Sequence, residues 1–250
     1  MTPFYLAPDA PANATAQAAA FGLPSISAPP PQGEYLTADS DGISLCRAGE
    51  KGRVRVDFAG GTAQYRRTKG GGELIAKAVA HTARPTVWDA TGGLGRDSFV
   101  LASLGLNVTT FEQNPAVACL LSDGLNRAAA ADSDTATAAA RITLHFGNAC
   151  TLMKALAAEC RPDVVYLDPM YPERKKSAAV KKEMAYFHGL IAEAQDETGL
   201  LAAAKAVAKK RVVVKRPRLG THLAGQTPAY CYEGKSTRFD VYLPDFPEHD

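Results

Sequence analysis

Apolar residues follow two alternating patterns from Thr86 to Leu243. Short runs rich in Val, Ile and Leu are typical of buried strands, and the longer segments between them repeat apolar residues at helical spacing. The strand-like runs are Val87–Ala90, Val108–Glu112, Ile142–Phe146, Val164–Asp168 and Lys210–Lys215. The helix-like segments are Ser98–Leu104, Pro115–Ala130, Thr151–Glu159 and Leu200–Lys209. This alternation predicts a mostly parallel sheet with helices on both faces. Residues 230–232 and 238–243 flank a turn-like segment and predict an antiparallel hairpin that completes the sheet.

The first third of the chain has a different composition. Residues 1–33 are rich in Ala and Pro, and they predict a loosely ordered leader with one short helix near Ala14–Phe21. Residues 34–72 contain short alternating segments bounded by glycines, which predict a small β subdomain. The α/β domain then occupies residues 73–250. Within it, the alanine-rich segment 128–140 predicts a helix end followed by a surface loop.

Composition narrows the class of protein. The chain has 250 residues, 46% of them hydrophobic, which is enough for a substantial core. Its five cysteines are dispersed without a C-x-x-C pair, so neither a disulfide framework nor a zinc site is indicated. We expect no metal, no membrane segment and a cytoplasmic location. The net charge of +2 is too small to indicate nucleic-acid binding by itself.

A glycine-rich turn follows the first strand-like run. Gly92, Gly93 and Gly95 come directly after Asp89, and a helix-like segment begins beyond them. Glycine permits positive φ and a close approach of ligand to backbone, and a helix start presents unpaired N–H groups. The turn therefore predicts a cofactor site, although many such turns bind nothing and the prediction depends on its neighbours.

Polar residues also end the next strand-like runs. Glu112 lies 17 positions after Gly95, a suitable spacing for a carboxylate that accepts hydrogen bonds from ribose hydroxyls. Asn148 and Ala149 follow the third run and suit the edge of an adenine ring. Because the carboxyl ends of parallel strands meet at one edge of the sheet, we expect these groups to converge.

The fourth strand-like run ends in Asp168-Pro169-Met170-Tyr171-Pro172, where two prolines impose a rigid turn. An exocyclic amino group of a nucleobase is a poor nucleophile, because its lone pair is delocalised into the ring. Asp168 and the carbonyl of Pro169 would accept its N–H bonds, and Tyr171 would stack on the base. These three residues are the predicted catalytic group.

Residues 89–97 resemble the cofactor loop of class I S-adenosylmethionine-dependent methyltransferases, and residues 168–172 resemble their acceptor loop for amino groups. More narrowly, the chain from Leu36 to Val241 is similar to the RsmJ family of bacterial 16S ribosomal RNA guanine-N2 methyltransferases. Further segments carry this similarity: 56–61, 66–72, 175–184 and 211–217. The resemblance implies a Rossmann-like fold with a seven-stranded sheet, S-adenosylmethionine as cofactor, and 16S ribosomal RNA or the small ribosomal subunit as substrate.

The resemblance also implies positions for the cofactor contacts. They are Asp89, Gly93, Gly95, Arg96, Asp97, Glu112, Gln113, Asn148, Ala149 and Asp168. Gln113 stands where the family usually has a basic residue, and the loop around residues 147–150 differs from the family in length and composition.

Basic residues cluster beside the proposed strand ends. They are Arg66, Arg67, Lys69, Arg174, Lys175, Lys176, Lys215 and Arg216. We expect them to contact RNA phosphates, whereas for an isolated cluster an ordinary solvated loop explains the same residues.

Other function classes fit parts of the pattern. A nicotinamide-dependent oxidoreductase would share the glycine turn and Glu112, but residues 93–98 lack the third glycine of G-x-G-x-x-G. A non-catalytic RNA-binding protein would share the basic residues but has little use for the acceptor turn. A methyltransferase acting on another nucleic-acid amino group is the alternative within the same enzyme class.

Overall fold

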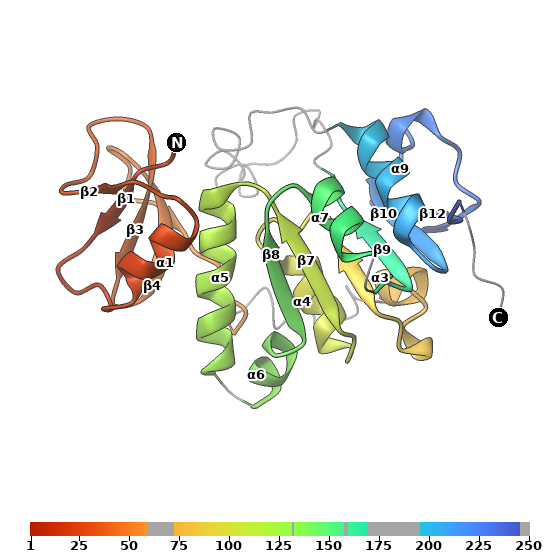
Figure 1. The fold of residues 1–250 in the computed structure, drawn as a ribbon, viewed down its shortest axis with the longest axis horizontal. Coiled ribbons are helices and arrows are strands. Elements are labelled where there is room, and N and C mark those ends of the chain that lie inside the picture. Colours follow the sequence, from red (N-terminus) through yellow and green to blue (C-terminus); the bar gives the residue numbers. More distant parts are fainter. Residues whose placement is uncertain (60–72, 132, 158–159, 170–195, 246–250) are drawn as a thin grey trace.

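A seven-stranded sheet forms the centre of the molecule in the computed structural model, which describes residues 1–59, 73–131, 133–157, 160–169 and 196–245 (Figure 1). Its strand order is β11-β12-β10-β9-β6-β7-β8. The strands are β6 (Val87–Asp89), β7 (Val108–Glu112), β8 (Ile142–Phe146), β9 (Val164–Leu167), β10 (Arg211–Pro217), β11 (Tyr230–Glu233) and β12 (Thr237–Tyr242). Strands β6 to β10 are parallel, and β12 pairs antiparallel with β10 and β11. The predicted fold class is confirmed.

Helices cover both faces of this sheet (Figure 1). They are α3 (Glu73–Ala78), α4 (Arg96–Ser103), α5 (Pro115–Ala129), α6 (Ser133–Ala139), α7 (Ala149–Leu156) and α9 (Glu197–Val207), with short 3-10 turns η1 (His81–Ala83) and η2 (Leu223–Gly225). Alternate strand residues face opposite sides. Val213 packs with the core of α3, α4 and α5, whereas Val212 and Val214 pack with the core of α7 and α9.

Residues 1–33 contribute two strands to a second sheet, so the prediction of a loosely ordered leader is wrong, whereas the short helix predicted near Ala14–Phe21 is present as Ala14–Ala20. This five-stranded sheet has the order β2-β1-β3-β4-β5. Its elements are β1 (Phe4–Leu6), α1 (Ala14–Ala20), β2 (Ser25–Ile26), β3 (Glu34–Asp39), β4 (Gly42–Arg47) and β5 (Arg53–Val54). Strand β1 pairs with β3, and Phe4 is fully buried. Burial of Phe4 and Leu23 outweighs the poor strand propensity of the flanking prolines.

The segment after β5 fixes the small sheet against the helices of the large one. Arg127 of α5 donates a hydrogen bond to the carbonyl of Val56 and pairs with Asp123 at 2.8 Å. The Phe58 ring stacks on Phe99 of α4, with centroids 4.2 Å apart. Both sheets therefore contribute to one continuous core, and Figure 1 shows the small sheet beside α5.

The segment expected to be a surface loop after α5 instead forms α6 in the described residues. Thr135 and Ala138 of this helix are buried, and α6 packs against α4 and α5. Alanine has the highest helix propensity, and here its small side chain permits close packing between helices. The surface-loop prediction for this segment is therefore wrong.

Phe58→Ala should lower the free energy of unfolding by about 3–5 kcal/mol, because it removes a buried aromatic ring that joins the two sheets. Phe58 is 3% exposed. Urea unfolding measures the change. Leu219→Ala is the control, because Leu219 is 95% exposed and its truncation should alter stability by less than about 0.5 kcal/mol. Equal effects of the two substitutions would contradict the docking described here.

Candidate active site

The turn between β6 and α4 has a backbone that only glycine fits well. Gly93 and Gly95 have φ values of 51° and 73°, in the left-handed region. A Cβ atom on Gly92 would lie 2.9 Å from the carbonyl oxygen of Phe111, and one on Gly95 would lie 3.2 Å from the Phe58 ring. The turn is therefore compact, with the first residues of α4 directly behind it.

Asp89 lies beneath this turn and holds it in shape. One carboxylate oxygen accepts hydrogen bonds from the Thr91 N–H at 3.1 Å and from its hydroxyl, and the other accepts one from the Ser98 hydroxyl at 2.5 Å. Asp89 is 2% exposed. Burial raises the pKa of Asp89 to about 7, although its hydrogen bonds oppose that rise. Its side-chain hydrogen bonds go to the turn and to the helix that follows.

Glu112, at the end of β7, reaches the same turn. Its carboxylate accepts hydrogen bonds from the Gly93 N–H at 2.9 Å and the Asn114 N–H at 2.6 Å. Burial raises the pKa of Glu112. Each carboxylate oxygen has a second lone pair, so Glu112 retains the capacity to accept further hydrogen bonds. The predicted proximity of Glu112 to the glycine turn is thus present in the structure.

The residues expected beside an adenine ring also lie next to each other. The Asn148 side-chain amide donates a hydrogen bond to Gln113 Oε1 at 3.2 Å. Its carbonyl oxygen accepts one from the Thr151 N–H and so caps α7, whose first residue is Ala149. Gln113 therefore joins the ends of β7 and β8.

The acceptor loop touches the glycine turn directly. The Asp168 N–H donates a hydrogen bond to Thr91 Oγ1 at 2.6 Å, and the Ala90 N–H donates to the Tyr166 carbonyl at 3.0 Å. Strands β6 and β9 are neighbours in the sheet, so their carboxyl ends meet at this point. The two sequence motifs, which are about 77 residues apart along the chain, therefore form one site.

Lys215 joins the acceptor loop to α4. Its Nζ lies 2.6 Å from Asp97 Oδ2 and 2.8 Å from Asp168 Oδ2. The Tyr166 hydroxyl also donates to Asp97 Oδ2, at 2.7 Å. Burial alone would lower the pKa of Lys215, but the two carboxylates raise it well above its usual value. Burial raises the pKa of Asp168, and Lys215 opposes that rise.

Two of the predicted RNA contacts differ from expectation. Lys215 points to the carboxylates of the site and not to open solvent. Arg216 faces the opposite side of β10, where it pairs with Glu197 of α9 at 3.1 Å and is only 2% exposed. Arg216 therefore cannot contact RNA, and that prediction is wrong. Arg66, Arg67, Lys69, Tyr171, Arg174, Lys175 and Lys176 lie outside the described residues.

Three residues of the site were not predicted from the sequence: Thr91, Ser98 and Tyr166. Tyr166 occupies an apolar strand run, where it reads as a core residue, and its hydroxyl partner Asp97 lies 69 positions away. Thr91 lies inside the glycine turn, and its position two residues after Asp89 was the available signal. Among the described residues, no cluster of three His, Cys, Asp or Glu side chains could hold a metal ion.

Comparison with known proteins decides the family. Residues 18–244 match a family described as "Putative SAM-dependent methyltransferase". The chain is 72% identical over 226 residues to the ribosomal RNA small subunit methyltransferase J of Neisseria meningitidis, covering 90% of each chain. The protein of the same name from Chromobacterium violaceum is 48% identical over 229 residues, covering 89% of this chain and 88% of that one. The chain belongs to the methyltransferase J family.

The methyltransferase fold agrees with a solved relative. A crystal structure of a SAM-dependent methyltransferase from Neisseria gonorrhoeae aligns with a TM-score of 0.85 and 61% identity, covering 99% of this chain and 98% of that chain. The protein is therefore a methyltransferase that uses S-adenosylmethionine. The interpretation as a nicotinamide-dependent oxidoreductase is not supported by these relatives.

Asp89→Asn should change how the stability of the methyltransferase depends on pH. In the wild type, unfolding lowers the pKa of Asp89 from about 7 to its usual 3.8, so the folded state binds more protons between these values. Stability contributed by this group therefore falls as the pH rises from about 4 to about 7. Asp89→Asn should not show this loss of stability as the pH rises. Urea unfolding at several pH values measures the free energy of unfolding of both proteins. Asp41→Asn, at an exposed position, is the control, and parallel wild-type and Asp89→Asn curves would contradict the assignment.

Proposed function

We propose that this methyltransferase transfers the methyl group of S-adenosylmethionine to the exocyclic N2 amino group of a guanosine in small-subunit (16S) ribosomal RNA. The observation that supports this most directly is the contact between Thr91 and Asp168, which places a cofactor-type turn against an acceptor loop for amino groups. The names of the relatives indicate the small-subunit ribosomal RNA. The choice of N2 follows from the resemblance to guanine-N2 enzymes.

The residues around the turn suit S-adenosylmethionine. The compact glycine backbone and the start of α4 would face the methionine end of the cofactor, with Arg96 and Asp97 nearest to it. Glu112 would accept hydrogen bonds from the ribose hydroxyls. The adenine would lie beside Gln113, Asn148 and Ala149. Asp89 would act from beneath by fixing the turn, because its carboxylate is buried and bonded to Thr91 and Ser98.

The reaction requires little beyond placement. When bound, S-adenosylmethionine would supply the methyl group to the nitrogen lone pair, and its sulfur would keep the electron pair of the broken carbon–sulfur bond. Asp168 and the Pro169 carbonyl would accept the two N–H bonds of the amino group and align its lone pair. The proton released from the methylated nitrogen would pass to Asp168. Tyr171 would stack on the base.

The RNA must present an unpaired base to this site, because stacking within a duplex would hide the amino group. Arg66, Arg67, Lys69, Arg174, Lys175 and Lys176 stay predicted phosphate contacts. We place the enzyme in the cytoplasm, where ribosomal RNA is made and assembled. No helix in the described part of the chain is long and apolar enough to cross a membrane.

Incubation with labelled S-adenosylmethionine and unmodified small-subunit RNA or particles, followed by digestion to nucleosides, should yield N2-methylguanosine. Asp168→Ala should reduce transfer by about 100-fold or more, because a positioned proton acceptor contributes at least that much, while cofactor binding stays measurable by calorimetry. Asp41→Ala is the matched control at an exposed position. A methyl group on another nucleoside would overturn the proposed substrate atom, and near-normal turnover by Asp168→Ala would overturn the role of Asp168.

Lys215→Met should lower kcat and move the acidic limb of the pH–rate profile to higher pH, because loss of the cation allows the pKa of Asp168 to rise further. Lys215→Arg keeps the charge and should restore much of the wild-type profile. Thermal melting and cofactor affinity separate this effect from misfolding. If the acidic limb of Lys215→Met lies at the same pH as in the wild type, Lys215 has only a structural role.

A further inference from the structure

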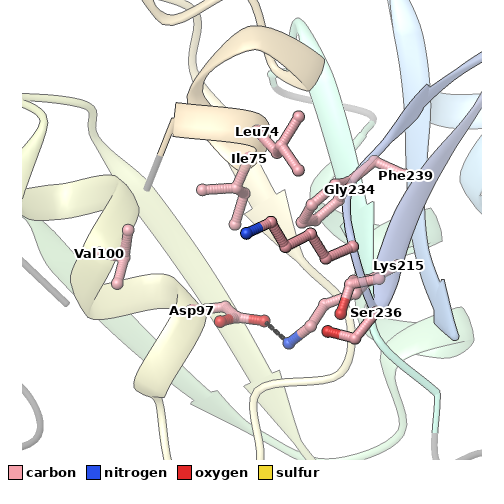
Figure 2. Close-up of a pocket in the computed structure, with 10 residues that line it drawn as sticks. Leu74, Ile75, Asp97, Val100, Lys215, Gly234, Ser236 and Phe239 are labelled. Carbon is pink, nitrogen blue, oxygen red and sulfur yellow. Dashed lines mark hydrogen bonds and ion pairs between the residues drawn. The ribbon is translucent and has the colours of Figure 1, made fainter. Parts of the chain in front are cut away.

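A cavity of about 450 Å³ lies beside the Asp97–Lys215 ion pair. Figure 2 shows this pair at one side of the cavity, with α3 above it and the turn between β11 and β12 facing it. Because Lys215 also contacts Asp168 at 2.8 Å, the cavity adjoins the acceptor loop. Its volume lies within the range of about 300–1,000 Å³ found for ligand pockets.

The upper part of the cavity is apolar. Leu74 and Ile75 of α3 point into it (Figure 2), and Phe239 of β12 and Val100 of α4 complete this wall. Ile75 and Phe239 are buried in the main core, so their positions are fixed by packing. A planar base or a sugar ring is a suitable neighbour for such a surface, because it buries apolar area without leaving a charge unpaired.

The hairpin turn supplies the polar part. Lys235 and Ser236 line the cavity and are exposed. The other nearby cations have carboxylate partners: Lys215 pairs with Asp97 and Asp168, and Arg218 lies 3.6 Å from Glu233. Lys235 has no carboxylate partner within the described part of the chain. A lysine ammonium and a serine hydroxyl together suit a phosphate group.

We propose that this cavity binds the nucleotide that enters the active site, with its phosphate at Lys235 and Ser236 and its sugar or base against Leu74 and Ile75. This inference rests on the proposed function, since it assigns part of the RNA site. The turn between β11 and β12 thereby becomes a phosphate contact that no sequence motif indicated. The methionine carboxylate of the cofactor is the other anion that Lys235 and Ser236 could bind. Separate measurements of RNA binding and cofactor binding distinguish the phosphate from this carboxylate.

Lys235→Gln should raise the KM for in vitro transcribed small-subunit RNA by about 5- to 20-fold, while the Kd for S-adenosylmethionine and the melting temperature stay unchanged. In direct RNA binding without turnover, the slope of log affinity against log salt should fall by about 0.7–0.9, the value for one lost phosphate contact. Lys235→Arg should restore both. Lys154→Gln on α7 is the control, because Lys154 is exposed and lies on the opposite face of the sheet.

Leu74→Trp gives an independent test, because a larger side chain should occupy the cavity and weaken RNA binding without changing cofactor affinity. Weaker cofactor binding by Lys235→Gln would overturn the proposal by assigning the cation to the cofactor. An unchanged RNA affinity and salt slope would also overturn it. These binding measurements need no turnover. The two proposals can therefore fail separately. If Lys235→Gln weakens RNA binding but the wild-type enzyme methylates another nucleoside, the proposed function is contradicted and the assignment of the cavity is not.

Discussion

The hydrogen bond from the Asp168 backbone to the Thr91 hydroxyl is the contact on which the site depends, because it joins the cofactor turn to the acceptor loop. Both partners lie at the carboxyl ends of adjacent parallel strands, so the sheet itself fixes their separation. Asp89 then holds Thr91 from below. Methyl transfer by alignment requires this kind of rigidity, since small displacements of the reacting atoms cost large factors in rate.

Charge balance at the site depends on one lysine. Asp97 and Asp168 both contact the Lys215 ammonium, and Tyr166 donates a further hydrogen bond to Asp97. Without the cation, the repulsion between two carboxylates this close together would favour protonation of one of them. In the proposed mechanism, Lys215 would thus keep Asp168 ionised and able to accept hydrogen bonds from an amino group. Asp97 and Lys215 also line the adjoining cavity.

The sequence was sufficient for the elements of the large sheet and for the meeting of its loops, because buried parallel strands leave clear apolar runs such as Val164–Leu167. It was insufficient where contacts between residues far apart in the sequence determine whether a side chain is buried. Arg216 reads as a surface cation, yet strand alternation turns it away from Lys215 and toward Glu197. The Pro-rich start of the chain predicts a loose leader, yet Phe4 is fully buried in a core that the sequence pattern does not reveal.

The most direct test of the shared site is a crystal structure with an S-adenosylmethionine analogue that carries an amine in place of the methylsulfonium group. We expect the position of the transferred methyl group, next to the amine, to face the Asp168 carboxylate across a gap of roughly 6 Å, which leaves room for one acceptor nitrogen at about 3 Å from each. An analogue bound at the glycine turn with its amine directed away from Asp168 would contradict the account.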